Sequence, residues 1–481
     1  MSPIFRTFLK VVAAAGVIAW ILVLDMVGAA THSEATLFSG LMMAPPSLHA
    51  DEAVQWSLAK DAAAGAAYSD GQDKFHGPAL ALAARGVFAL RGLKFDDATE
   101  SDLRFVPFLF YLLVCAAPLA LRGVSWPLKA SAAVILFLSS AGCYFGQYYI
   151  QESLLVAGFV WGTLLWMESA DDPRPGWKLA LAGAGFGLAL ASKVTAAAYL
   201  GVLLLALLFL ARETLTWRRT VWAAAGATLI WLSLQTWLFT DMNGVAAWGR
   251  QFWRSFGVAS GNEDTLALTN PGYWWVVGLW LALLVAIRLR RAGPRSVRDV
   301  PLALAVGCFL FHLALPYKTP WLLFLPVCLS LAVIWPRLAE GSALSRSFSA
   351  FLATAFVCAS ALVLERHTDT RFHGNGFARE LGAYRRSWER ANPGKDFYVA
   401  VDGGHYWPLP YYLRAFEVGY GDFEGAERAP VRILQAQDGS RPAVPGRRTY
   451  SLSMRAGEQF WVLLQEGQGV RAELDHVTGL R

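Results

Sequence analysis

The chain has 481 residues, of which 55% are hydrophobic and only 16% are charged, whereas soluble domains carry about 25% charged residues. This composition excludes an ordinary soluble protein of several domains and indicates an integral membrane protein. The net charge of +6 is no sign of nucleic-acid binding. Many basic residues lie in short loops between apolar segments, where they set membrane topology.

Apolar segments long enough to cross a bilayer recur along the chain. Arg6 and Lys10 precede the first segment, which we interpret as a retained signal-anchor helix rather than a cleaved signal peptide. Segments 178–193 and 195–211 are also compatible with one long helix that is interrupted at Lys193. Because a spanning helix needs about 20 mostly apolar residues, the sequence predicts a polytopic α-helical membrane protein with about eleven spans, at 9–30, 103–121, 130–147, 153–168, 178–193, 195–211, 220–240, 273–290, 300–316, 320–335 and 347–364.

The basic residues of the short loops predict the orientation of these spans. Cytoplasmic loops are enriched in Lys and Arg. Every second loop is basic, whereas the short loops between them hold only Lys193 and Lys318. The basic loops carry Arg122, Lys129, Arg174, Lys178, Arg212, Arg218, Arg219, Arg288, Arg290, Arg291, Arg295, Arg298, Arg337 and Arg346. We therefore expect a multi-pass protein of the inner (plasma) membrane with a cytoplasmic N-terminus and an extracytoplasmic tail.

Residues 1–365 form the predicted membrane domain. Its long outer loop, 31–102, contains two stretches with helical character, near 50–66 and 77–92. Both stretches are amphipathic enough to lie along the membrane surface. We therefore expect interfacial helices in this loop.

The tail, 366–481, differs from the rest of the chain in being charged and rich in Gly and Pro. Short apolar runs at 397–401 and 460–464 are typical of strands. These features predict a small soluble α/β domain outside the membrane.

Candidate functional residues gather where apolar segments meet the outer face. His49-Ala50-Asp51-Glu52 lies at a predicted helix start, where the two carboxylates are equally compatible with helix capping. His76 lies in a polar turn of the same loop and, taken alone, is more typical of a structural residue. Three further ionisable residues lie at the outer ends of predicted spans: Glu152, Lys193 and Lys318.

These positions favour a functional site over independent structural roles. Ionisable residues at membrane depth are costly, so a paired or functional role is the first hypothesis. The alternative is that Lys193 and Lys318 extend along the helix ends to reach water. Lysines that only extend to water at a helix end would be expected on both faces of the membrane. The outer face is the one on which lysines are normally rare.

The residue types indicate which chemistry such a site supports. Lysines at the outer boundary suit the phosphate of a lipid carrier, and a carboxylate suits a general base that deprotonates an acceptor hydroxyl. A divalent metal ion is compatible with Asp51, Glu52 and a nearby histidine, His49 or His76, because hard cations prefer oxygen ligands.

This arrangement resembles the GT-C superfamily of membrane glycosyltransferases, which includes the protein O-mannosyltransferases and the aminoarabinose and related transferases of glycosyltransferase family 39. The motifs that match are an acidic pair in the first outer loop, a second acidic position at the start of the fourth span, a Ser/Thr-Lys pair and a Lys shortly before Pro. In this chain they are Asp51-Glu52, Glu152, Ser192-Lys193 and Lys318-Thr319-Pro320. More specifically, residues 49–54, 75–78, 317–322 and 406–414 resemble a prokaryotic branch known as flippase activity-associated proteins.

The resemblance implies a glycosyltransferase. Such an enzyme moves a sugar from a polyprenyl-phosphate-linked donor to a hydroxyl of a glycan, lipid or protein acceptor on the extracytoplasmic face. The implied catalytic residues are Asp51 as the base, with Glu52 and Glu152 orienting the acceptor or holding a metal. The implied substrate-binding residues are Lys193 and Lys318 at the donor phosphate, with His76 and Tyr317 nearby.

Two other functions stay open. A non-enzymatic translocator or accessory protein for lipid-linked glycans needs charged groups along a path through the membrane. His312 is the main candidate for such a group, although it is more typical of a core histidine. A receptor or scaffold that acts through the tail leaves the membrane lysines unexplained. The aromatic run 406–414 is compatible with packing against the membrane domain or with substrate contact.

Overall fold

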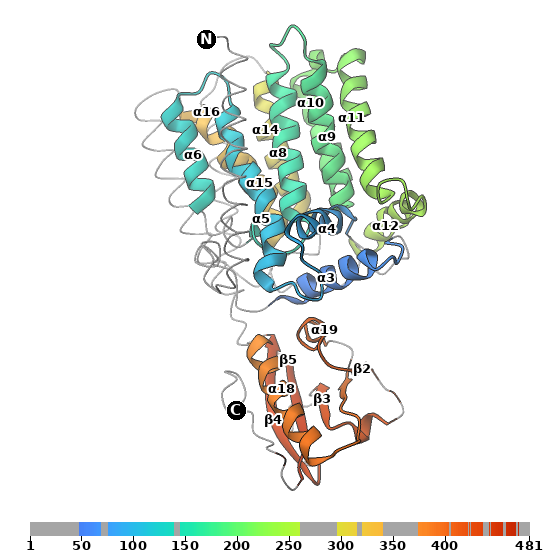
Figure 1. Cartoon of the computed structure of the whole chain (residues 1–481). Coiled ribbons are helices and arrows are strands. Elements are labelled where there is room, and N and C mark those ends of the chain that lie inside the picture. Colours follow the sequence, from blue (N-terminus) through green and yellow to red (C-terminus); the bar gives the residue numbers. More distant parts are fainter. Residues whose placement is uncertain are drawn as a thin grey trace. The chain divides into compact units, whose positions relative to one another are not determined.

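The computed structural model describes residues 48–68, 76–138, 145–259, 296–314, 320–339, 374–403, 406–421, 423, 425–435, 442, 444–455, 458–467 and 470 (Figure 1). Two compact units contain them. One comprises the described residues of Asp61–Leu364, and the other those of Pro45–Lys60 and Glu365–Arg481. The sequence-based division at 365/366 places 45–60 in the membrane domain, whereas in the structure most of α3 (Ala50–Ala63) groups with the tail.

The first unit is helical. Among its helices, α9 packs against both α8 and α11, and Figure 1 shows these three side by side. The helices of this unit are α4 (Ala79–Arg91), α5 (Glu100–Ala116), α6 (Trp126–Leu138), α8 (Glu152–Glu168), α9 (Gly176–Ser192), α10 (Thr195–Leu210), α11 (Trp217–Gln235), α12 (Asn243–Ala259), α14 (Val300–Ala314), α15 (Phe324–Leu329) and α16 (Trp335–Ala339).

Small residues explain how closely these helices approach one another. A Cβ placed on Gly158 of α8 would lie 2.3 Å from the Gly185 carbonyl oxygen of α9. On the other side of α9, a Cβ on Gly183 would lie 1.9 Å from the Ala223 carbonyl oxygen of α11. Backbones in contact at small residues are typical of helix packing in membranes, where apolar burial alone gives no preference for protein over lipid.

The structure describes some of the predicted spans and not others. Within the described residues, one helix, Glu100–Ala120, is long and apolar enough by length and composition to cross a membrane, and it contains most of the predicted span 103–121. The structure has a break at Lys193, where the sequence places the boundary between segments 178–193 and 195–211: α9 ends at Ser192, Lys193 is extended, and α10 begins at Thr195. Predicted spans 9–30, 273–290 and 347–364 lie outside the described residues. The count of about eleven spans stays a prediction.

The second unit contains a five-stranded mixed sheet in the order β2-β1-β3-β5-β4. Strands β2, β1 and β3 are parallel, and β3, β5 and β4 are antiparallel. Strands lie at both predicted places, as β1 and β5. The strand bounds are β1 Val399–Asp402, β2 Val418–Tyr420, β3 Val431–Gln435, β4 Arg447–Arg455 and β5 Glu458–Gln465.

Helix α18 (Gly374–Ala391) is amphipathic. Its buried residues include Phe377, Leu381, Tyr384 and Trp388, at spacings of three and four that place them on one face. The rings of Tyr384 and Trp388 contact Phe397, just before β1, with centroid distances of 6.0 and 5.7 Å. The unit also contains the short helix α19 (Leu409–Tyr412), which lies within the aromatic run 406–414.

Candidate active site

A buried ion pair joins the start of α8 to the end of α9. Lys193 Nζ donates a hydrogen bond to Glu152 Oε1. The two residues are only 8% and 4% exposed, respectively. Glu152 is the first residue of its helix, where the helix dipole favours a negative charge. The structure therefore brings together two of the predicted site residues.

The backbone around His76 holds the Lys193 end of this pair. His76 forms an antiparallel bridge with Lys193, and the Gly77 N–H donates to the Ser192 carbonyl oxygen at 2.8 Å. Lys193 is therefore held extended (φ −153°, ψ 138°) instead of continuing the helix. A Cβ on Gly77 would lie 1.9 Å from the Ala191 carbonyl oxygen, so this close approach requires glycine.

Gln151 holds the same segment from the α8 side. Its Nε2 donates to the Gly77 carbonyl oxygen at 3.0 Å, and its Oε1 accepts from the Leu80 N–H at 3.2 Å. From α12, Gln251 Nε2 donates to the His76 carbonyl oxygen at 3.4 Å. The predicted site residue His76 thus lies on a loop that several hydrogen bonds fix beside the ion pair.

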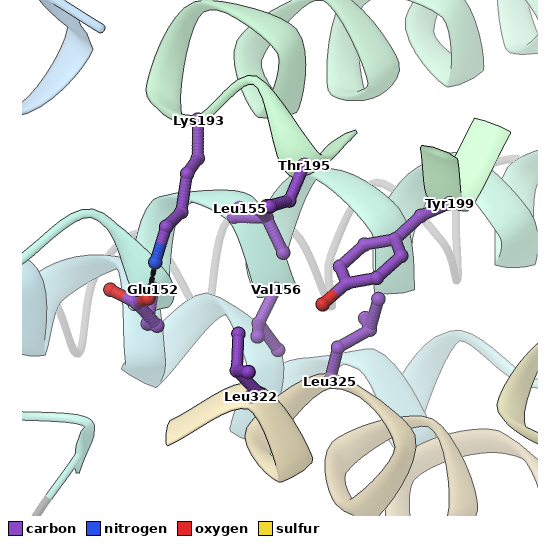
Figure 2. A pocket seen from close by; sticks show the side chains of 8 residues that line it. All are labelled: Glu152, Leu155, Val156, Lys193, Thr195, Tyr199, Leu322 and Leu325. Atoms are coloured by element: carbon purple, nitrogen blue, oxygen red, sulfur yellow. Dashed lines mark hydrogen bonds and ion pairs between the residues drawn. The ribbon is translucent and has the colours of Figure 1, made fainter. Parts of the chain in front are cut away.

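A pocket opens beside the ion pair (Figure 2). Figure 2 shows Lys193 and Glu152 pointing toward one another on one side of it. Within the described residues, Glu152 Oε2 and Thr195 Oγ1 are buried and have no hydrogen-bond partner. The pocket therefore combines a polar end, which can bind a further polar group, with a largely apolar wall. Its lining residues are Glu152, Leu155, Val156, Lys193, Thr195, Tyr199, Leu322 and Leu325.

Tyr317 and Lys318 lie outside the described residues. The chain is described again from the short helix η4 (Pro320–Leu323). Leu322 of this helix lines the pocket, four residues after Lys318 in the sequence. The predicted role of Lys318 thus stays a prediction.

The acidic pair of the first outer loop belongs to the second unit. Glu52, the third residue of α3, is fully buried, and its Oε2 accepts from the His49 N–H at 2.8 Å. This contact is the half of a capping box in which the side chain reaches back to the helix start. The Asp51 side chain is 42% exposed, and its Oδ2 lies 3.6 Å from His49 Nδ1. The capping interpretation therefore fits Glu52, whereas the Asp51 carboxylate is accessible.

The predicted metal set does not fit this geometry. Glu52 already accepts a backbone hydrogen bond without solvent exposure, and His49 Nδ1 accepts from the Asp51 N–H at 3.3 Å. In the described parts of the chain, no three or more His, Cys, Asp or Glu side chains are grouped so that they could hold a metal ion.

Two polar residues near the ion pair belong to none of the motifs quoted from the sequence. Thr195 lines the pocket, and the buried Gln151 directly precedes Glu152. Tyr199 Oη and His312 Nε2 lie 2.5 Å apart and are both buried. This pairing fits the interpretation of His312 as a core histidine.

Comparisons with known proteins show the fold. No protein-family model matches the chain, and no curated protein matches it in sequence. The crystal structure of ArnT from Cupriavidus metallidurans in the apo state matches with a TM-score of 0.57 and 14% identity, over 96% of this chain and 99% of that chain. The same protein bound to undecaprenyl phosphate matches with a TM-score of 0.53 and 14% identity, over 99% of this chain and 100% of that chain. The chain therefore shares its fold with ArnT.

Proposed function

We propose that the chain is a GT-C glycosyltransferase that moves a sugar from a polyprenyl-phosphate-linked donor to an acceptor hydroxyl on the extracytoplasmic face of the inner membrane. The observation that carries this proposal is the buried Glu152–Lys193 pair at the polar end of a largely apolar pocket. The fold supports it, because ArnT has the same fold and has been crystallised with undecaprenyl phosphate.

The lining of the pocket has the two kinds of surface that a phosphate joined to a polyprenyl chain requires. Lys193 supplies a positive charge for the phosphate, and Lys318 is the second proposed cation. Leu155, Val156 and Leu325 supply an apolar wall for the adjacent isoprenoid carbons. A buried ammonium group also stabilises the negative charge that builds on the leaving phosphate in the transition state.

The carboxylates have separate proposed roles. Asp51 is the general base: the acceptor oxygen attacks the anomeric carbon, its proton passes to the Asp51 carboxylate, and the bond from the sugar to the phosphate oxygen breaks with its electron pair left on the phosphate. Glu152 orients the acceptor through its unpartnered Oε2. Glu52 orders the start of α3 beside Asp51. His76 and Tyr317 are proposed substrate contacts.

A binding experiment tests the phosphate site without knowledge of the sugar. Purified protein is titrated with undecaprenyl phosphate and analysed by native mass spectrometry. We expect wild-type protein to bind and Lys193→Met to bind about 10–100-fold more weakly, because a hydrogen bond to a charged group is lost.

Lys178→Met is the matched control. Lys178 is also a buried lysine, 6% exposed, in an ion pair with Asp172, but it lies at the start of α9 rather than at its end. Wild-type protein that fails to bind, or equal losses in the two variants, would contradict the proposed phosphate site.

A further inference from the structure

The aromatic run 406–414 binds the helix start that carries Asp51. The Leu48 N–H donates to Tyr412 Oη at 2.6 Å, across 364 positions of the sequence. Both residues are buried. Leu48 lies three residues before Asp51, so this hydrogen bond fixes the chain just ahead of α3.

A second contact fixes α3 beyond Asp51. The ring of Trp56 packs edge-on against the ring of Tyr411, with centroids 5.1 Å apart at an interplanar angle of 89°. Trp56 and Tyr411 are both buried. Asp51 therefore lies between two anchoring contacts, and both anchors are provided by neighbouring tyrosines of the tail.

The tyrosine pair is itself held firmly. The two rings pack edge-on with centroids 5.0 Å apart. Gly374, at the start of α18, lies against the Tyr412 ring so closely that a Cβ there would lie 2.4 Å from it. The Arg414 guanidinium lies 4.1 Å from the centroid of the Tyr411 ring, and Arg414 Nη1 donates to the Tyr411 carbonyl oxygen at 2.7 Å. Neither anchor can move without disturbing these contacts.

We propose that Tyr411 and Tyr412 are positioning residues that aim the Asp51 carboxylate by fixing both sides of it on α3. This inference rests on the proposed function, in which Asp51 is the base. A base acts only from within hydrogen-bonding distance of the proton that it removes. A misplacement of about 1 Å lowers the rate about 100-fold. The tail is therefore part of the catalytic arrangement, although neither tyrosine needs to touch substrate.

Tyr412→Phe tests the role, because it removes only the oxygen that accepts from Leu48. We expect kcat for sugar transfer to fall about 10–100-fold. The donor KM and undecaprenyl phosphate binding should not change, because the substitution leaves Lys193 in place. The double variant Tyr412→Phe/Asp51→Asn should be as active as the single variant Asp51→Asn, because the tyrosine acts through the carboxylate.

Tyr398→Phe is the matched control. Its hydroxyl donates to a backbone carbonyl of the same unit, that of Gly425 at 2.9 Å, and does not contact α3. Its kcat should equal that of wild-type protein. Hydrogen exchange over 48–56 should rise in Tyr412→Phe and not in Tyr398→Phe.

The possible failures are distinguishable. Unchanged hydrogen exchange over 48–56 in Tyr412→Phe would overturn the anchoring contact, whether or not transfer is measurable. Faster exchange with an unchanged kcat would overturn the positioning role. Full transfer by Asp51→Asn would instead overturn the base assignment within the proposed function.

Discussion

Lys193 and Glu152 form a buried ion pair across 41 positions of the sequence, between the residue that follows the end of α9 and the first residue of α8. Two charges taken out of water are tolerated only when each satisfies the other. The pair thus joins α8 to α9 at the proposed phosphate site, and it couples the stability of the bundle to the groups that the reaction needs.

The ion pair should show strong coupling in a double-mutant cycle. Lys193→Met or Glu152→Leu alone leaves one buried charge without its partner and should lower the free energy of unfolding by about 3–5 kcal/mol. The double variant should lose clearly less than the sum, because neither charge remains. Thermal unfolding in detergent measures the stability of wild-type protein, the two single variants and the double variant. Additive losses would show that the two side chains do not stabilise each other.

Gly77→Ala should disturb the site through the backbone. The new Cβ would meet the Ala191 carbonyl oxygen, so the bridge between His76 and Lys193 must open. We expect a loss of transfer of at least about 10-fold, because Lys193 would be displaced. Gly86→Ala is the control: nothing lies within 4 Å of its Cβ, and in a helix alanine is favoured over glycine by about 1 kcal/mol. Equal activity in the two variants would argue against the close approach.

Substitutions of Asp51 and Glu52 should have different effects, on catalysis and on stability respectively. Asp51→Asn should reduce transfer at least about 100-fold with unchanged thermal unfolding, because an exposed carboxylate is replaced by an amide of similar shape. Glu52→Ala should instead lower the free energy of unfolding by about 1 kcal/mol, because the His49 N–H loses its acceptor. Transfer assays and thermal unfolding of both variants measure the separation. Full activity in Asp51→Asn would contradict the base assignment.

Tyr384 should make the tail sensitive to alkaline pH. Burial raises the pKa of the Tyr384 hydroxyl above its ordinary value of 10.0, so the folded state holds the proton more tightly than the unfolded state. Its contribution to stability is complete below that ordinary pKa and is lost as the pH rises through the higher pKa of the folded state.

Tyr384→Phe should reduce the loss of stability that occurs at alkaline pH. The variant gives up hydrogen bonds to the carbonyl oxygens of Pro430 and Gln465, so it should be less stable at neutral pH by about 1 kcal/mol. Its stability should then fall less steeply than that of wild-type protein as the pH rises above 10.0. Unfolding measured at several pH values gives the two slopes, and parallel slopes would show that Tyr384 does not titrate differently in the two states.

Much of the site follows from the sequence, because topology and chemistry act together there. Glu152 and Lys193 are predicted from their shared outer face, and His76 is implied by the family resemblance; the structure brings these three together. The break between α9 and α10 lies where the predicted spans 178–193 and 195–211 meet, but its cause is less predictable. Lys193 is extended because the His76 segment pairs with it, and such a tertiary contact leaves no mark on local helix propensity.

The association of α3 with the tail is beyond sequence reasoning of this kind. Tyr412 lies in the aromatic run 406–414, for which packing is one of two possibilities left open by the sequence, but nothing in the sequence pairs it with Leu48, which lies 364 positions away. The sequence leaves capping as one of two possible roles of Glu52, and the capping contact with the His49 N–H is visible only in the structure. Thr195 and Gln151 carry no motif, and they become visible only once the pocket and its hydrogen bonds are known.

The Leu48–Tyr412 hydrogen bond also has a consequence for biosynthesis. Synthesis runs from the N-terminus, so Leu48 is made 364 residues before its partner. The helix that carries Asp51 is therefore synthesised long before its anchor exists. Under the proposed function, a chain released before Tyr412 is made lacks the contact that positions Asp51, so it should transfer no sugar.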